Sequence, residues 1–335
     1  MKVKLKDIAE ATGFSVNTVS HALRDRPDIP ESTREKIKLA AKEMGYIKNA
    51  HASSFRSGKT STISVILPDI TNPHFTIVFR EIEEYFRGVG MTPMFINTNE
   101  NAEEELNAVR HAIEQNSAGV IICPTQDNKD SLRLLEKSSI PYVLIGRRFP
   151  EEKGSDYVVC DDTEGAACAT ESLILSGHKK IAFVGAGELI SSGRERLLGY
   201  KSALAEAKIP YDDTYVYHVD LKSAPSTEAL ESFLSQISDA TAIVAFSDSL
   251  AFRIIRSLAK LGRRVPEDVS VIGFDNVCSD YIFPTMLSSV SVSKKTMAKE
   301  ASSLLFKKIS STTAPPEHIV LPTKLFPRET TAKRK

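Results

Sequence analysis

The sequence lacks the cysteine patterns of metal and redox sites. Its four cysteines form no Cys-x-x-Cys motif; they are Cys123, Cys160, Cys168 and Cys278. Cys123 and Cys160 lie in apolar runs of the kind that form buried strands. We interpret all four as reduced core residues of a cytoplasmic protein, rather than as zinc ligands or disulfide partners.

Long apolar segments are missing as well. No stretch is long and apolar enough to span a bilayer. Three lysines and Asp7 interrupt the first seven residues, where a signal peptide would need an apolar run. We therefore expect a cytoplasmic protein with no membrane partner.

The chain also lacks the common motifs of catalysis. It has no Gly-x-Ser-x-Gly elbow, no Gly-x-x-x-x-Gly-Lys phosphate loop and no His, Cys and Asp cluster at metal-binding spacing. Gly185 and Gly187 form a lone Gly-x-Gly after a strand-like run, which is a weak signal for nucleotide binding. We expect a protein that is not an enzyme and that uses no cofactor or metal.

The chain as a whole has a formal net charge of zero, but its two ends differ in charge. Residues 1–60 hold 12 Lys or Arg and 7 Asp or Glu, and the remainder carries the compensating negative charge. A basic end on a neutral chain indicates a polyanionic partner at that end. Taken alone, the excess is also what a solvated charged face would give.

What the chain does contain near its start is a pattern of two short amphipathic helices, in the segment KLKDIAEATGFSVNTVSHAL. Gly13 separates them, because glycine tolerates the backbone of a tight turn, and Ser15 is placed to cap the second helix. Four short polar groups are left on the outside of the second helix: Asn17, Thr18, Ser20 and His21. This is the helix-turn-helix pattern, and a third helix is expected over residues 31–44.

From residue 61, apolar five-residue runs alternate with helical patterns. This alternation is typical of the α/β class, and the number of runs favours two doubly wound parallel sheets. We expect a helix-turn-helix domain over 1–48, a hinge helix or linker over 49–60 and a two-lobed core over 61–330. The first lobe would comprise 61–160 and 291–330, with the last helix near 294–310, and the second lobe would comprise 161–290.

Polar residues follow several of the strand-like runs. In open α/β sheets, ligands bind beyond the carboxyl ends of the strands, so two facing lobes would form a polar cleft suited to a hydroxyl-rich small molecule. The alternative for each residue is that it caps the next helix, as we expect for Asp248. The residues are Asp69, Asn97, Arg147, Asp161, Ser247, Asp248 and Asp275.

Ordered motifs give the chain a close resemblance to the lactose-repressor/galactose-repressor family of bacterial transcription regulators. They run from about residue 3 to residue 330 and are KDIAEATGFSVNTVSHAL, STREKIKLAAKEMGYIKNA, SGKTSTISVILPDITNPHF, SGHKKIAFVG, RERLLGYKSAL, FSDSLAFRIIRSLAKLGRRVPEDVSVIGFDN and PRET. The resemblance implies a helix-turn-helix domain, a hinge helix and a core like that of periplasmic sugar-binding proteins. It also implies a homodimer that binds a nearly palindromic operator in double-stranded DNA and responds to a small effector.

The resemblance also implies the DNA contacts. The base-reading positions fall on Val16, Asn17 and His21, and His21 stands where the family commonly has an arginine. Arginine reads guanine with two parallel hydrogen bonds that an imidazole cannot make, whereas Asn17 can pair with adenine. We expect an operator that differs from the common family consensus. Positions that touch phosphates are Ser15, Thr18, Ser20, Thr33, Arg34 and Asn49, although capping alone would also explain Ser15.

The implied hinge positions are Ala52, Ser53 and Phe55. Ser53 and Phe55 stand where the family usually has an arginine and a leucine. Phe55 can unstack a base step as an apolar wedge in the minor groove; alternatively, it packs against its dimer mate or the core. Ser53 lacks the minor-groove cation, which softens a preference for a narrow, A·T-rich groove.

The effector cleft is implied in the same way. Arginine offers a rigid fork of donors and a carboxylate accepts two hydroxyl protons, so we expect Arg196 and Asp275 to clasp the vicinal hydroxyls of a sugar. A salt bridge between these two residues, with no ligand, is the alternative. Phe75 is suited to stack on an apolar sugar face. The full implied set is Asn72, His74 and Phe75 in the first lobe, and Ser192, Arg196, Ser247 and Asp275 in the second.

Two other functions stay open at this point. The chain could be a global regulator controlled by a phosphorylated carrier protein that docks on its outside, as in some members of the resembled family. A free-standing sugar-binding transport protein would explain residues 61–330 but not the first 60. In the regulator, closure of the cleft would shift the two recognition helices. Most members of the resembled family are repressors, so we expect repression.

Overall fold

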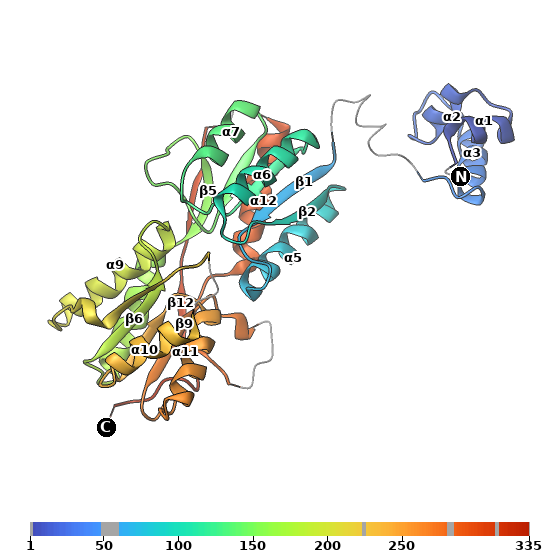
Figure 1. Ribbon diagram of the computed structural model, residues 1–335. Helices are drawn as coiled ribbons and strands as arrows, with labels where there is room; N and C mark the ends of the chain where they lie inside the picture. The colour runs from blue at the N-terminus through green and yellow to red at the C-terminus, as the bar shows by residue number, and fades with distance from the viewer. Residues whose placement is uncertain (1–2, 48–59, 223–225, 280–284, 312–314, 335) are drawn as a thin grey trace. The chain divides into compact units, whose positions relative to one another are not determined.

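The computed structural model describes residues 3–47, 60–222, 226–279, 285–311 and 315–334. The chain divides into two compact units, residues 1–60 and residues 61–335. In its described part, the first unit contains α1 (Leu5–Thr12), α2 (Val16–Ala22) and α3 (Glu31–Glu43), which are labelled in Figure 1. A small apolar core joins them, formed by Ile8, Ala9, Val19, Ala22, Ile37 and Ala41.

The turn between α1 and α2 follows the predicted pattern. Gly13 adopts a left-handed conformation with φ of 75° and ends α1. The Ser15 hydroxyl caps α2 by accepting the Thr18 amide at 3.1 Å. The prediction that Ser20 lies on the outer face is wrong. Only 6% of its surface is exposed, because it is on the face of α2 that packs against the rest of the unit.

The first lobe of the larger unit is built on a six-stranded sheet with the order β11-β5-β4-β3-β1-β2. All its neighbouring strands are parallel. Helices α5 and α12 pack together on one face, and α6 and α7 cover the other. The elements are β1 (Thr62–Leu67), α5 (Pro73–Gly88), β2 (Thr92–Asn97), α6 (Ala102–Glu114), β3 (Gly119–Ile122), α7 (Asp130–Ser138), β4 (Tyr142–Ile145), β5 (Asp156–Cys160), α12 (Lys294–Ser310) and β11 (His318–Leu321).

The second lobe has a six-stranded sheet with the order β12-β10-β9-β8-β6-β7. It is parallel except where β12 pairs antiparallel with β10. Helices α8 and α9 cover one face and α10 and α11 the other. The elements are α8 (Asp162–Leu175), β6 (Ile181–Ala186), α9 (Ser191–Glu206), a 3-10 turn (Asp213–Tyr215), β7 (Val216–Val219), α10 (Thr227–Gln236), β8 (Ala242–Ala245), α11 (Asp248–Lys260), β9 (Ser270–Phe274), a 3-10 turn (Val277–Ser279), β10 (Ser288–Ser291) and β12 (Lys324–Phe326).

The predicted α/β class with two doubly wound sheets is therefore confirmed, with one correction to the lobes. The chain crosses between the lobes after β5, after β10 and after β11. As expected, α12 and β11 return to the first lobe (Figure 1). Residues after 323, which were expected there too, belong to the second lobe, because β12 pairs with β10 and the Thr330 hydroxyl binds the Val271 carbonyl at 2.7 Å.

Helices α8 and α9 approach each other very closely at one point. A Cβ atom built on Gly199 of α9 would lie 2.0 Å from the Thr163 carbonyl oxygen of α8. No side chain fits there, so a glycine is required by the contact itself. This contact fixes the position of α9, whose first two turns carry the predicted site residues Ser192 and Arg196.

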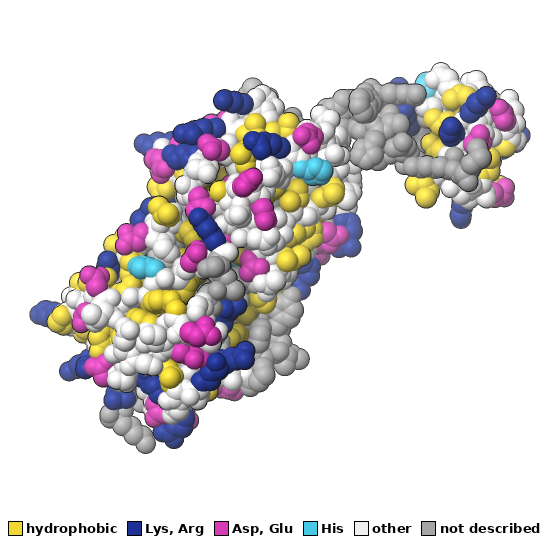
Figure 2. All heavy atoms as spheres, in the orientation of Figure 1, with side chains coloured by type: hydrophobic (Ala, Val, Ile, Leu, Met, Phe, Trp, Pro, Cys, Tyr) yellow, Lys and Arg dark blue, Asp and Glu magenta, His cyan; other side chains and the backbone are white. Residues whose placement is uncertain are grey.

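The distribution of charge on the surface and the character of the helices add two observations. On the face shown in Figure 2, basic and acidic side chains are interspersed over the larger unit without a large field of one sign. Among the described residues, no helix combines the length and the apolar character that crossing a membrane requires.

Candidate DNA-reading helix and effector pocket

Helix α2 presents the three predicted base-reading side chains outward. Val16 is 46% exposed, Asn17 is exposed and His21 is half-buried. Asn17 and His21 are four residues apart and thus share one helix face. The structure brings these side chains together, and their contact with bases stays a prediction.

His21 has a partner that the sequence did not reveal. Its Nδ1 atom lies 2.8 Å from the Asp28 carboxylate, in the loop between α2 and α3. A carboxylate can only accept, so Nδ1 carries the proton and Nε2 is the ring nitrogen that remains for a base. This hydrogen bond from His21 lowers the pKa of Asp28. A single ring nitrogen makes at most one hydrogen bond to a base, unlike an arginine fork.

The predicted phosphate contacts fall into three groups. Ser15, Thr18, Thr33 and Arg34 keep some exposed surface near the N-terminal ends of α2 and α3, where helix amides favour anions. Ser20 is buried, which argues against its predicted role. The remaining predictions lie outside the described residues: Asn49 and the hinge residues Ala52, Ser53 and Phe55.

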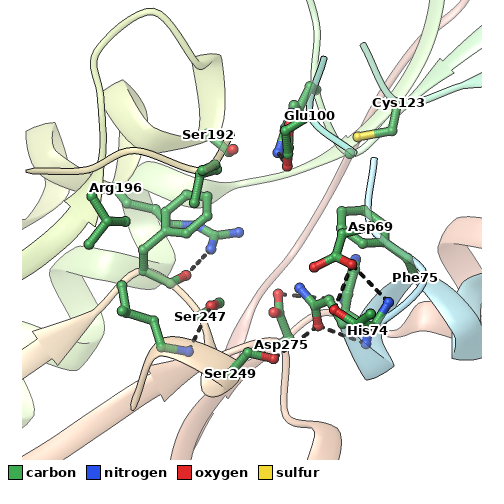
Figure 3. Close-up of a pocket in the computed structure, with 18 of the residues that line it drawn as sticks. Asp69, His74, Phe75, Glu100, Cys123, Ser192, Arg196, Ser247, Ser249 and Asp275 are labelled. Carbon is green, nitrogen blue, oxygen red and sulfur yellow. Dashed lines mark hydrogen bonds and ion pairs between the residues drawn. The ribbon is translucent and has the colours of Figure 1, made fainter. Parts of the chain in front are cut away.

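A cavity of about 570 Å³ lies between the two lobes of the larger unit, beyond the carboxyl ends of their strands. Figure 3 shows side chains from both lobes around it, with Asp69, His74 and Phe75 facing Ser192, Arg196 and Ser247 across the open space. A cavity of this size fits a small metabolite. The structure thus places at one pocket the implied residues Asn72, His74, Phe75, Ser192, Arg196, Ser247 and Asp275.

The Arg196 guanidinium contacts two aromatic rings, a carboxylate and a backbone carbonyl. Its guanidinium carbon lies 3.6 Å from the ring centre of Phe274 and 4.6 Å from that of Phe246, a cation–π arrangement. Its Nε donates to Asp162 at 2.8 Å, and its Nη1 donates to the Phe246 carbonyl oxygen. Asp162 therefore forms the salt bridge with Arg196 that was weighed for Asp275. Burial raises the pKa of Asp162, and the adjacent Arg196 opposes that shift.

Asp275 supplies a buried carboxylate from the loop after β9. Burial raises its pKa to about 6, while Arg196 and Lys294 act to lower it. The closest histidine atom is Nδ1 of His74 in the first lobe, 3.5 Å from the carboxylate. Burial lowers the pKa of His74 to about 3, with nearby cations adding to the effect. At neutral pH, therefore, His74 is neutral and Asp275 is mostly ionised and able to accept hydroxyl protons.

Arg147 also lines the pocket, but its guanidinium is already engaged. Nη1 and Nη2 donate to the two Glu100 oxygens at 2.7 and 2.6 Å, and Nη1 also donates to the Pro124 carbonyl at 3.1 Å. Arg147 and Glu100 are both buried. Arg147 thus forms a neutralised part of the pocket wall, and its effector contact stays a prediction.

Three other predictions concern residues next to the first turn of a helix: Asp161, Ser247 and Asp248. The Asp161 carboxylate accepts the Glu164 amide at 3.0 Å and caps α8, and Asp161 is not among the residues of the pocket wall. Its predicted effector contact is wrong, and the capping alternative holds. Asp248 was expected to cap α11, and this prediction is wrong. The cap is Ser247, whose hydroxyl accepts the Leu250 amide at 3.2 Å, and Asp248 is fully buried.

Asp162, Glu100 and Phe246 are among the residues around the pocket that the sequence analysis missed. Asp162 was signalled by the Asp-Asp pair after YVVC, but the pair did not show which carboxylate turns toward α9. Glu100 and Phe246 lie just beyond β2 and at the end of the AIVAF run. Their place at strand ends was a usable signal, because ligands bind at that edge of the sheets.

Direct hydrogen bonds join the two lobes around the pocket. The Ser191 amide donates to the Gln126 side chain at 2.8 Å, and the Ser249 hydroxyl donates to the Asn72 side chain at 3.3 Å. Ion pairs add to them, one between Arg148 and Glu195 and another between Lys222 and Asp127, each at 2.8 Å. The two lobes therefore contact each other directly beside the pocket.

Three of the four cysteines are core residues in the structure, and the prediction is wrong for Cys168, which is only partly buried. All four are free, and Cys123, Cys160 and Cys278 are buried. Burial raises the pKa of Cys123 to about 12 and raises that of Cys160 as well. Both thiols line the pocket in their protonated form. Within the described residues, no three His, Cys, Asp or Glu side chains are grouped as a metal site would need.

Comparison with known proteins shows what this architecture resembles. Residues 4–49 match the model of bacterial regulatory proteins of the lacI family, and residues 170–331 match a periplasmic binding protein-like domain. The chain is 30% identical to the HTH-type transcriptional repressor PurR of Photobacterium profundum over 306 residues, 91% of each chain. It is 30% identical to catabolite control protein A of Priestia megaterium over 332 residues, 99% of this chain and 100% of that one.

A solved complex of the transcriptional regulator CelR with cellobiose has the same fold. Its TM-score is 0.73 at 28% identity, and the match covers 98% of this chain and 100% of the other. The helix-turn-helix unit and the two-lobed core thus define a DNA-binding transcriptional regulator rather than an enzyme. The chain belongs to the LacI family of bacterial regulatory proteins, as the resemblance in its sequence predicted.

Proposed function

We propose that this protein is a homodimeric repressor whose affinity for a palindromic operator is set by a small molecule in the pocket between the lobes. The observation that carries the proposal is the cavity of about 570 Å³ between the lobes, whose wall takes polar side chains from both. A ligand that contacts both lobes binds their closed arrangement more tightly than an open one. It can thereby shift the regulator between two states.

The charges of the pocket favour an uncharged sugar over a sugar phosphate. Of the three arginines in the pocket wall, Arg196 and Arg147 are each neutralised by a buried carboxylate, Asp162 and Glu100, so neither of these two presents a free fork to a phosphate. Asp275 offers a carboxylate to hydroxyl groups, and Phe75 and Phe246 offer apolar faces for a sugar ring. The cellobiose held by the similar regulator CelR agrees with this class.

The same observations favour a small effector over a phosphorylated carrier protein. The buried polar groups converge on the inside of the pocket, where a folded carrier protein cannot reach. A carrier docking outside would leave Asp275 buried in a polar cavity with no ligand to compensate for the cost of burial. We therefore keep the sugar as the effector class.

We propose a homodimer because a single helix-turn-helix unit contacts only a short stretch of DNA. A single recognition helix reads only a few base pairs, and a second copy doubles the site and makes it palindromic. Val89 and Met94, which are 42% and 49% exposed near the start of β2, offer apolar contact area in the first lobe for a second copy. We propose residues 1–48 as the DNA-binding domain and residues 49–60 as the hinge, with Phe55 as a minor-groove wedge.

The effector class is tested by a thermal-shift panel on the full chain. Unphosphorylated mono- and disaccharides, their phosphates, nucleosides and purines are compared at equal concentration. A sugar present at 100 times its Kd should stabilise the protein by about 2.7 kcal/mol, which raises the Tm by roughly 5–10 °C. A shift confined to phosphorylated compounds or to purines would reject the sugar assignment, and no shift with any compound would reject the pocket as the regulatory site.

His21→Arg tests the DNA-reading face. An arginine there can form two hydrogen bonds with a guanine, which is worth roughly 1–3 kcal/mol against other bases. We expect the variant to select guanine at one position in each half-site in a binding selection from random DNA. Arg24→Ala, on the exposed loop after α2, serves as the control and should leave the selected bases unchanged. If His21→Arg returned the wild-type consensus, His21 would not be a base-reading residue.

A further inference from the structure

The turn that carries Asp275 has an unusual backbone. Asp275 and Asn276 both have positive φ angles, 103° and 53°. Residues other than glycine rarely adopt such angles, and they persist only where the surrounding structure holds them. The position of this turn determines where the Asp275 carboxylate points, so whatever holds the turn also shapes the pocket.

The second lobe holds the turn through three consecutive backbone amides. The Asp275 amide donates to the Val290 carbonyl at 2.8 Å. The next amide donates to the Ser289 hydroxyl at 3.0 Å, and the Val277 amide donates to the Asp248 carboxyl at 2.7 Å. The Ser289 hydroxyl in turn donates to Asp248 at 2.6 Å. Helix α11 and strand β10 thus fix the amide side of the turn.

Asp248 accepts these hydrogen bonds at both of its carboxyl oxygens. It is fully buried, and burial, with a contribution from nearby Asp275, raises its pKa to about 8, while the bonds from Ser289 and Val277 act to lower it. Asp248 anchors the turn from within the second lobe, and Asp275 is the carboxylate of the turn that lines the pocket.

The first lobe reaches the same turn from its other side. Lys294, the first residue of α12, is buried, and its Nζ donates to the Asp275 carbonyl at 2.8 Å and to the Asn276 carbonyl at 3.2 Å. Helix α12 packs on the first sheet and on α5, as Figure 1 shows. A side chain from one lobe therefore binds two backbone carbonyls of the other, next to the crossing after β10.

We propose that Lys294 is the positioning residue of the effector site: it clamps the Asp275 turn against the first lobe and so aims the carboxylate into the pocket. The proposal rests on the proposed function, in which Asp275 binds the effector. The amide bonds fix the turn within its own lobe, and Lys294 sets its position relative to the first lobe. Loss of Lys294 should loosen the turn while the fold and the DNA-binding unit stay intact.

Hydrogen exchange of the full-length protein tests this clamp without any ligand. Lys294→Met keeps the length of the buried side chain but removes the donor, and Lys295→Met is the matched control, because Lys295 is the exposed neighbour on the same helix. A hydrogen bond from a charged group corresponds to roughly 10–100-fold in an equilibrium. We expect amides of residues 270–279 to exchange at least about tenfold faster in Lys294→Met. The control and distant peptides should match the wild type.

Lys294→Arg provides the rescue, because a guanidinium keeps the cation and its donors. It should bring the exchange rate of residues 270–279 back toward the wild-type value. Operator affinity in the absence of sugar should stay within twofold of wild type for the control, Lys295→Met. Wild-type exchange in Lys294→Met, or faster exchange spread over the whole chain, would overturn the proposal. If Lys294→Met does not fold, Lys294→Gln is measured by the same criteria.

The effector role is tested separately, with the panel sugar that stabilises the wild-type protein most. Its Kd should rise at least about tenfold in Lys294→Met and stay unchanged in Lys295→Met. An unchanged Kd in the presence of faster exchange would show that Lys294 holds the turn but does not position the binding carboxylate, which overturns the proposal. If no sugar binds the wild type, the proposed function fails, and the exchange result still decides whether Lys294 clamps the turn.

Discussion

Asp275→Asn should make the protein more stable and less responsive to its effector at the same time. Burial raises the pKa of Asp275 from 3.8 to about 6, so above pH 6 the folded protein carries an ionised group that the unfolded chain solvates better. A shift of this size corresponds to about 3 kcal/mol, and Asn removes that cost. The Tm at pH 7.5 should therefore rise by up to roughly 10 °C.

The pH dependence of the Tm shows whether the charge of Asp275 causes the gain in stability of Asp275→Asn. The folded-state pKa of Asp275 is raised, so its destabilising effect is present above pH 6 and disappears as the pH falls toward 3.8. The Tm difference between Asp275→Asn and wild type should follow the same course in scans from pH 4 to pH 8. A difference that is constant with pH would show that packing, and not the charge of Asp275, explains the gain.

The loss of effector response in Asp275→Asn has a separate reason. An amide nitrogen donates where the carboxylate accepts, so hydrogen bonds from two sugar hydroxyls are weakened. Hydrogen bonds to charged groups contribute roughly 1.5–3 kcal/mol each, so the Kd of the sugar should rise about 100-fold. Isothermal titration measures this change. Asp69→Asn, in the opposite lobe, serves as a comparison and should have a smaller effect, because the Asp69 carboxylate is partly engaged by the Thr71 amide and hydroxyl.

Arg196→Ala should abolish effector response and also destabilise the protein, which complicates its use as a simple binding variant. It leaves Asp162 buried without its cation, and breaking a buried ion pair in this way costs about 3–5 kcal/mol. Arg196→Met combined with Asp162→Leu removes both charges and should recover most of the stability, because apolar replacement of a buried pair is often neutral. Neither variant should respond to sugar.

Two measurements separate these effects. Chemical denaturation gives the free energy of unfolding, and anisotropy of labelled operator DNA gives the response to sugar. Arg194→Ala, an exposed arginine on the same helix, is the control and should behave as wild type in both. A double variant that regains stability and also regains the sugar response would show that Arg196 supports the fold but does not bind the effector.

Much of this fold could be predicted from the sequence, because buried parallel strands leave apolar runs that are hard to mistake. Strands β10 and β12 show where that signal ends, because neither contains an apolar five-residue run. In β10 (Ser288–Ser291), three of the four residues are serines and Ser288 and Ser289 are fully buried. Their hydroxyls are satisfied by Thr331 and Asp248, which are distant in sequence. Such pairings cannot be foreseen from local composition.

The pocket was harder to predict than the fold, for a geometric reason. Strand-end residues could be found, but whether each turns into the cavity or back onto its own helix depends on one or two backbone angles. Asp161 turns back to cap α8, and its neighbour Asp162 reaches Arg196 on α9. The partners of Arg147 and His21 were likewise fixed by loops, Glu100 beyond β2 and Asp28 between α2 and α3.

The contact between α8 and α9 at Gly199 has a consequence for how this regulator can change. One added methyl group there would lie 2.0 Å from the Thr163 carbonyl oxygen and force the helices apart. Because α9 carries Ser192 and Arg196 into the pocket, that displacement would move both side chains from a site outside the cavity. Position 199 is thus a place where a mutational screen should recover regulators that no longer sense their metabolite, although no atom of the residue reaches it.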